Sequence, residues 1–167
     1  MGGADNTRLV RYGDTVTVWS WKNAFIRGNK NGNVDISGRL NSPDDIPRRW
    51  AWEYFVIEDA NEPQGPGNRG PVKFGDSVYL KTWNNNFVGA GSDNTIKQTV
   101  NRKSLETFMI ESPEVAGKSG NAMTYGDMFY FKTWRKTYIC IPENGSSAVQ
   151  SSKKDASCQF RIYDSYG

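Results

Sequence analysis

The sequence predicts an all-β domain built from three four-stranded repeats with pseudo-threefold symmetry. Three segments align without gaps, and each begins with an aromatic residue followed by Gly and Asp. Every copy places a Trp eight residues after that Gly and a further aromatic residue four positions after the Trp. A Phe-x-Ile block then closes each unit. The aligned segments are residues 12–26, 74–88 and 125–139, and the closing blocks are residues 55–57, 108–110 and 160–162.

Each repeat contains four segments with the pattern of a short β-strand. The first has apolar residues at every second position, as a half-buried strand requires. The second starts at the aromatic residue after the Trp, and a turn rich in Gly, Asn and Ser separates it from the third. The third lies near residues 34–36, 96–98 and 148–150, and the fourth carries the Phe-x-Ile block. No helical periodicity extends beyond one turn.

Units of this size cannot bury their own apolar faces, and closing three of them into a barrel removes the exposed strand edges. We therefore expect residues 1–167 to form a single domain, with repeats at about 9–64, 71–120 and 121–164. One threefold core is expected from fifteen apolar residues: Val16, Val18, Phe25, Phe55, Ile57, Val78, Leu80, Phe87, Phe108, Ile110, Phe129, Phe131, Tyr138, Phe160 and Ile162.

The pattern resembles the β-trefoil superfamily over about residues 9–164, with the repeat order of fascin-like and fibroblast-growth-factor-like proteins. The Glu-x-Phe-x-Ile closure begins at Glu53 and at Glu106, whereas the third copy has Cys158 in place of the Glu. The Gln-x-Trp signature of ricin-type trefoil lectins is absent, so the sugar-site residues of that family do not carry over. The resemblance implies a β-trefoil fold, which hosts unrelated functions.

Two segments break the symmetry. The first repeat has about nine additional residues within 40–50, and a Gly- and Pro-rich loop spans residues 62–71. Arg48, Arg49 and Trp50 in the insertion suggest a secondary binding patch with a cation–π contact. The alternative is simply a lengthened loop. Trp52 aligns with Leu105 and Ser157 and is expected to be partly in the core.

Composition and charge narrow the function. The chain has six Trp, eight Tyr and eight Phe, more than a small core needs, so some rings are expected at the surface. The net charge is +3 with no run of five or six like charges, which predicts no nucleic-acid partner. The chain has no His, so a His-based triad or a His-containing zinc site is impossible. No nucleotide-binding or calcium-binding loop is present. We therefore predict no catalysis, no metal and no cofactor.

The repeated Trp21, Trp83 and Trp134 are the main candidate binding residues, and two placements are open. The favoured one packs the rings into the barrel floor. In the alternative, alternation continues and each Trp shares an outer face with the residues two and four positions before it. That face carries Trp19 in the first repeat, Tyr79 and Lys81 in the second, and Tyr130 and Lys132 in the third. With the turn residues Asn23 and Asn85, an exposed ring of this kind suits a sugar.

The repeated aromatic-Gly-Asp has a structural and a functional interpretation. Gly gives a turn its backbone freedom and Asp bonds nearby N–H groups, so a turn before each first strand explains all three copies. Three carboxylate ligands are the alternative. Cys140 and Cys158 occur in the third repeat only, so nothing in the repeat requires a bridge. We predict two free, largely buried thiols.

The sequence favours a carbohydrate-binding, lectin-like protein with up to three shallow sites and with glycans or glycoproteins as partners. The resemblance to trefoil lectins implies a role in defence or toxicity. The alternative is a protein-interaction trefoil of the actin-bundling, growth-factor or protease-inhibitor kind. No apolar stretch approaches a membrane span and no signal peptide is visible. A soluble protein, cytoplasmic or secreted, is therefore expected, with no indication of its oligomeric state.

Overall fold

The computed structural model describes residues 8–47, 50–61, 69–113 and 120–164. The all-β prediction is confirmed: within these residues the only helical segments are three-residue 3₁₀ turns, and none could cross a membrane. The strands are β1 Thr15–Ser20, β2 Ile26–Gly28, β3 Val34–Ile36, β4 Phe55–Asp59, β5 Ser77–Lys81, β6 Phe87–Ala90, β7 Ile96–Thr99, β8 Phe108–Glu111, β9 Met128–Thr133, β10 Tyr138–Cys140, β11 Val149–Ser151 and β12 Phe160–Asp164. The turns are η1 Pro43–Asp45, η2 Ser104–Glu106 and η3 Ala156–Cys158.

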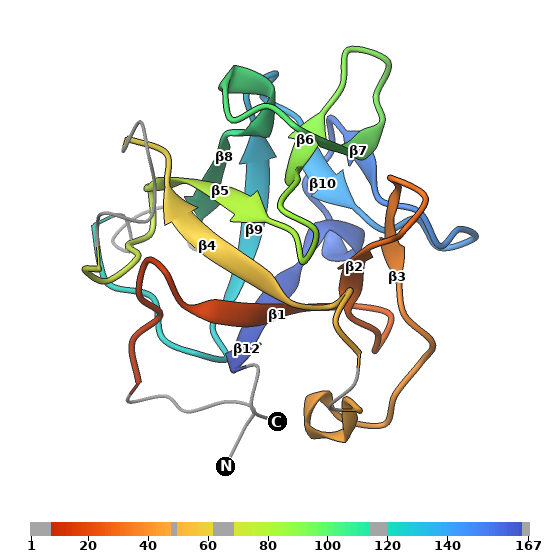
Figure 1. Cartoon of the computed structure of the whole chain (residues 1–167), viewed down its shortest axis with the longest axis horizontal. Coiled ribbons are helices and arrows are strands. Elements are labelled where there is room, and N and C mark those ends of the chain that lie inside the picture. The colour runs from red at the N-terminus through yellow and green to blue at the C-terminus, as the bar shows by residue number, and fades with distance from the viewer. Residues whose placement is uncertain (1–7, 48–49, 62–68, 114–119, 165–167) are drawn as a thin grey trace.

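Six strands close into a barrel, and three hairpins cover one end of it (Figure 1). Antiparallel pairing runs from β1 to β4, β5, β8, β9 and β12 and then returns to β1. The hairpins are β2–β3, β6–β7 and β10–β11. Each repeat thus contributes its first and fourth strands to the barrel and its middle two to a hairpin, so no barrel strand is left as an edge.

The barrel interior contains the predicted core with three differences. Twelve of the fifteen predicted residues belong to one buried cluster. Phe25 and Phe87 are buried outside it, and Phe25 packs edge-on against Trp19 with ring centroids 4.8 Å apart. The prediction for Tyr138 was wrong: this side chain is half-buried in a second cluster around Cys140 and Cys158. Its hydroxyl donates to the Glu111 carboxylate at 3.0 Å.

The aromatic-Gly-Asp segments are turns, as the structural interpretation predicts. Gly13, Gly75 and Gly126 have φ of 88°, 96° and 92°, a region that favours glycine. Each of their N–H groups donates to the carbonyl of the Ile that ends the closing block of the same repeat. Each Asp carboxylate accepts the backbone N–H three residues before it, at 2.9–3.0 Å. The three carboxylates therefore accept hydrogen bonds from the backbone of their own turns, as the structural interpretation expects.

Two of these carboxylates also join neighbouring repeats. The Tyr12 hydroxyl donates to Asp76 at 2.6 Å, and the Tyr125 hydroxyl donates to Asp14 at 2.7 Å. Burial, together with the carboxylate partner, raises the pKa of both tyrosines well above the ordinary value. The second repeat has Phe74 at this position, so the corresponding bond to Asp127 cannot form.

We expect Phe74→Tyr to raise the free energy of unfolding by about 1 kcal/mol, the usual net worth of one hydrogen bond. The new hydroxyl would face Asp127 by the same symmetry that pairs Tyr12 with Asp76. Urea unfolding of the variant measures the gain. Tyr12→Phe is the matched control and should lose a similar amount. A loss of stability in Phe74→Tyr would show that the third turn is not equivalent to the other two.

Cys140 and Cys158 form a disulfide, so the prediction of free thiols was wrong. The same two positions lie close in the other repeats, but with other chemistry. In the second repeat they are Gly89 and Glu106, where a Cβ on the glycine would lie 3.1 Å from the carboxylate. In the first they are Arg27 and Glu53; burial raises the pKa of Glu53, and the charge of Arg27 acts against that rise. The fold brings the pair together everywhere, and only the third repeat makes it covalent.

The insertion of the first repeat lies between β3 and β4 and projects beyond the barrel, at the bottom of Figure 1. It contains η1, which Ser42 caps by accepting the Asp44 N–H. The chain rejoins the repeat pattern at a turn in which the Tyr54 N–H donates to the Ala51 carbonyl at 3.1 Å. Equivalent bonds end η2 and η3, so the extra residues are an addition before a conserved turn.

Candidate functional site

The three repeated indoles are partly exposed, and each is fixed by its nitrogen. Trp21, Trp83 and Trp134 are 38%, 42% and 46% exposed, so the packing of these rings into the barrel floor is excluded. Each Nε1–H donates to a backbone carbonyl of the preceding repeat in the cycle, at 2.7, 2.8 and 3.0 Å. The acceptors, Ile141, Gly28 and Ala90, occupy equivalent positions. Each ring is thus held in place with part of its surface facing solvent.

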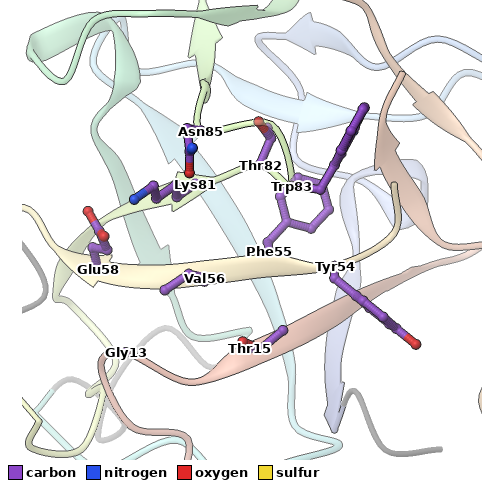
Figure 2. A pocket seen from close by; sticks show the side chains of 10 residues that line it. All are labelled: Gly13, Thr15, Tyr54, Phe55, Val56, Glu58, Lys81, Thr82, Trp83 and Asn85. Atoms are coloured by element: carbon purple, nitrogen blue, oxygen red, sulfur yellow. The ribbon is translucent and has the colours of Figure 1, made fainter. Parts of the chain in front are cut away.

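A cleft of about 370 Å³ lies beside Trp83 at the junction of the first and second repeats. We call it cleft 1. Figure 2 shows Lys81 and Glu58 toward one end of it and Trp83 and Tyr54 toward the other. Its lining residues are Gly13, Thr15, Tyr54, Phe55, Val56, Glu58, Lys81, Thr82, Trp83 and Asn85. Three predicted binding residues, Lys81, Trp83 and Asn85, therefore share one cleft.

The two charged side chains that line cleft 1, Glu58 and Lys81, differ in whether they have an ion-pair partner. Glu58 is buried and forms an ion pair with Arg102 at 3.0 Å, so its charge is already compensated. Lys81 is half-buried and has no ion-pair partner within the described part of the chain. The ammonium of Lys81 is therefore the charged donor that this cleft offers to a ligand.

A second cleft, of about 200 Å³, lies at the junction of the third and first repeats. We call it cleft 2. Trp21 and Asn23 lie where cleft 1 has Trp83 and Asn85, and Arg161 lies where it has Val56. The lining residues are Trp19, Ser20, Trp21, Asn23, Met128, Gln159, Phe160 and Arg161. Because these residues correspond position by position to those of cleft 1, the two clefts are copies of one site with different side chains.

The third equivalent position carries different chemistry. Lys132 there lies 4.0 Å from the Glu111 carboxylate, so its charge is partly compensated. It pairs across the strands with Met109, where cleft 1 pairs Lys81 with Val56. Lys136 replaces the turn asparagine. The three predicted sites are therefore not equivalent.

The asparagines at the clefts also have a conformational role. Asn23 and Asn85 have φ of 57° and 66°, in the left-handed region that Asn tolerates better than most residues. Lys136 takes the same conformation with φ of 64°. Backbone geometry alone therefore accounts for Asn at two of these turns. The same two side chains also line the walls of cleft 1 and cleft 2, which the backbone conformation does not require.

Trp83 is joined to an aromatic and charged cluster in the first repeat. Trp52 stacks on it with ring centroids 6.4 Å apart and an interplanar angle of 20°. The Arg27 guanidinium lies 5.1 Å from the Trp52 ring centroid and forms an ion pair with Asp35 at 2.7 Å. Trp52 is half-buried, in line with its expected partial burial. Trp83 thus has one contact surface toward Trp52 and borders cleft 1 with the rest.

The expected outer strips are not continuous. Tyr79 and Tyr130 are both 7% exposed, because cations cover their rings. Arg102 lies 4.3 Å from the Tyr79 centroid and Lys154 lies 5.2 Å from the Tyr130 centroid. The Trp is therefore at the surface in each repeat, whereas Tyr79 and Tyr130 are buried and Trp19 is half-buried.

The secondary patch of the insertion is only partly described. Arg48 and Arg49 lie outside the described residues. Trp50 is half-buried, and its backbone N–H donates to the Pro47 carbonyl. Within the part of the chain that is described, no group of three or more His, Cys, Asp and Glu could hold a metal. The site is thus defined by the two clefts.

Sequence reasoning missed Tyr54, Glu58 and Arg161. Tyr54 and Arg161 flank the closing-block Phe on either side, and Glu58 follows the first block directly. The signal was available, because residues that alternate with the inward-facing Phe and Ile, before, between or after them, lie on the opposite face of the strand. The sequence, however, does not show that this face borders the first strand of the next repeat.

No family model matches the chain, and no curated protein matches its sequence. Among the solved structures that resemble it are two that match over nearly the full length of both chains. A Caenorhabditis elegans protein of unknown function gives a TM-score of 0.73 at 9% identity, covering 96% of this chain and 99% of the other. The SDF2-like protein from Arabidopsis thaliana gives 0.68 at 9% identity, covering 92% and 94%. At this identity the likeness concerns the fold alone, and this chain has the β-trefoil fold that its repeats predict.

Proposed function

We propose that this protein binds carbohydrate at cleft 1 and cleft 2, and that it acts by binding rather than by catalysis. The observation that carries the proposal is that an indole and a turn asparagine occupy equivalent positions at two junctions, whereas the cation comes from a different strand in each, Lys81 of β5 in cleft 1 and Arg161 of β12 in cleft 2. In each cleft, a partly exposed indole lies beside a turn asparagine and one cationic side chain. A sugar ring presents an apolar face to an aromatic ring and hydroxyls to such polar neighbours.

The hydrogen bonds of the indoles favour this use. Because Nε1–H of Trp21 and of Trp83 already donates to backbone, each ring offers a ligand its face and edge and does not need to reorient. A fixed ring loses little conformational freedom on binding. The remaining hydrogen bonds to a ligand come from Asn85 and Lys81 in cleft 1, and from Asn23 and Arg161 in cleft 2.

The third position is a weaker candidate. Trp134 is as exposed as the others, but the neighbouring Lys132 is paired with Glu111. We therefore expect two principal sites, with Trp134 contributing at most a minor one. Two sites on one rigid barrel would increase affinity for a multivalent surface through effective concentration.

The disulfide favours a compartment outside the reducing cytosol. Cys140 and Cys158 are both buried, and such bonds persist in secreted and cell-surface proteins. A secreted glycan-binding protein fits the role in defence or toxicity that the trefoil resemblance implies.

Trp83→Ala is expected to lower binding to a glycan-coated surface by about tenfold or more, because it removes one of two linked sites. Trp21→Ala should act similarly, and the double variant should lose most of the binding. A glycan array with the wild type identifies the sugar, and surface binding of the variants follows. Thermal melting of each variant separates lost contacts with ligand from lost stability.

Two controls accompany this measurement. Trp83→Phe keeps an aromatic face and loses the bond to Gly28, so it should retain more binding than Trp83→Ala at similar stability. Val100→Ala changes a side chain that is 81% exposed and outside both clefts, and should bind as the wild type does. If the wild type binds none of the glycans on the array, the proposal of carbohydrate binding is rejected.

Exposed apolar side chains favour a second candidate, the recognition of a protein. Val100 and Leu105 are 81% and 40% exposed in the connection between β7 and β8. Apolar side chains at the surface contribute to protein interfaces when they are contiguous. Val100→Asp should abolish such binding and leave retention on glycans unchanged.

A further inference from the structure

The turn between β10 and β11 carries two polar side chains that the fold does not use. Asn144 and Ser146 are both exposed, and neither side chain forms a hydrogen bond within the described part of the chain. The hairpin turns of the other two repeats use such side chains: Asn31 Oδ1 accepts a backbone N–H at 3.0 Å, and Asp93 Oδ1 accepts one at 3.3 Å. Turn formation therefore explains Asn31 and Asp93 but not Asn144 and Ser146.

The two unused side chains belong to one short sequence with a known chemical meaning. Asn144, Gly145 and Ser146 form Asn-x-Ser, the acceptor sequence for N-linked glycosylation. This is the one place in the chain where an Asn is followed two residues later by Ser or Thr. Packing accounts for the central glycine, because a Cβ on Gly145 would lie 2.9 Å from Cγ of Pro142. Packing does not account for the amide or the hydroxyl on either side of it.

The backbone of this turn is held by groups other than these two side chains. Lys22 Nζ donates to the carbonyls of Glu143 and Gly145, both at 2.9 Å, so the peptide carbonyls on either side of Asn144 are bound. The Ser146 carbonyl accepts a backbone N–H from β3 at 2.9 Å. A large group attached to the Asn144 amide would therefore displace none of the described hydrogen bonds that order the turn.

The disulfide is an independent sign of the compartment in which such an attachment occurs. Cys140 ends β10, four residues before Asn144, and it is bonded to Cys158. Disulfides form and persist in the lumen of the endoplasmic reticulum and in secreted proteins, and N-linked glycans are carried by proteins of the same route. The other two repeats have neither a cysteine pair nor an Asn-x-Ser sequence. Two features confined to the third repeat thus indicate one environment.

We propose that Asn144 is the acceptor of an N-linked glycan. In the transfer, Asn144 Nδ2 forms a bond to the anomeric carbon of a lipid-diphosphate-linked oligosaccharide. The bond from that carbon to the diphosphate oxygen breaks, the lipid diphosphate leaves, and one amide proton is released. The Asn144 amide is available for this step because it is exposed and forms no described hydrogen bond. The assignment goes beyond the proposed carbohydrate binding and does not depend on it.

The test is the intact mass of the full chain secreted from cultured insect cells behind an added, cleavable leader. We expect the wild type to be heavier than the bare chain by one oligosaccharide, and peptide N-glycosidase to remove the difference. Asn144→Gln and Ser146→Ala should each be secreted at the mass of the bare chain. Ser147→Ala changes the neighbouring exposed serine, which lies outside the acceptor sequence, and should keep the oligosaccharide.

Three results would overturn the assignment. They are a wild type secreted at the bare mass, an oligosaccharide that survives in Asn144→Gln or in Ser146→Ala, and one that is lost in Ser147→Ala. Because no variant removes a described side-chain hydrogen bond, all should melt close to the wild-type protein after enzymatic deglycosylation. Fragmentation of the wild-type glycopeptide should place the sugar on Asn144, and a sugar found on a serine or threonine instead would also contradict the proposal.

Discussion

Phe108→Ala is expected to lower the free energy of unfolding by about 3–5 kcal/mol, the usual cost of removing a large ring from a packed core. Phe108 is fully buried in β8, and its ring centroid lies 6.0 Å from that of Phe131. The barrel surrounds this position with strands of all three repeats, so the cavity cannot collapse easily. Urea unfolding followed by far-UV circular dichroism measures the loss.

Val100→Ala serves as the control for Phe108→Ala, since Val100 lies in the chain that precedes β8 but is mostly exposed. Its effect should stay within about 0.5 kcal/mol. A loss below about 1 kcal/mol for Phe108→Ala would contradict a single closed core.

Removal of the disulfide should cost about 3 kcal/mol, because the bond closes a loop between residues 18 positions apart and restricts the unfolded chain. The variant with both Cys140→Ala and Cys158→Ala tests this in thermal or urea unfolding. Reductant should lower the stability of the wild type toward that of the variant and leave the variant unchanged. An intact mass two units above the oxidised value in the purified protein would show that the thiols are free.

The fold could be predicted because the repeat fixes it at the level of the backbone. Apolar residues at period two define the barrel strands, and glycines with positive φ mark where each repeat begins. Val16 and Val18 face inward for the same reason as Phe129 and Phe131, so three weak patterns support one another. The predicted limits of the strands agree with the observed ones to within about one residue, as for β3 and β11.

The position of the Trp rings could not be predicted from a single repeat. Trp83 follows the end of β5, where alternation stops, and its orientation depends on the Gly28 carbonyl of another repeat. The burial of Tyr79 has a related origin, since the side chain that covers it, Arg102, lies in the connection between β7 and β8, far from Tyr79 in the sequence of the same repeat. Tertiary contacts decided both cases, and only the folded chain defines them.

The disulfide was missed for a different reason. Absence of the Cys pair from the other repeats suggested that the third did not need it. In the structure the equivalent positions are close in every repeat, and Gly89 with Glu106 uses that closeness differently. The three repeats therefore share the backbone geometry at these positions, while the side chains there differ from one repeat to the next.

The pairing of β1 with β12 sets an order on folding during synthesis. Val16 lies opposite Asp164 and Ser20 lies opposite Phe160. The first barrel strand, β1, therefore cannot complete its pairing until the last strand, β12, has been synthesised. Until then an edge of β1 is open while roughly the whole domain emerges from the ribosome, a situation that slows folding and exposes unpaired backbone. Early growth can proceed through neighbouring pairs such as β4–β5 and β8–β9, which are close in sequence. Ring closure is then the final event, and a chain released before residue 160 has no strand with which to complete it.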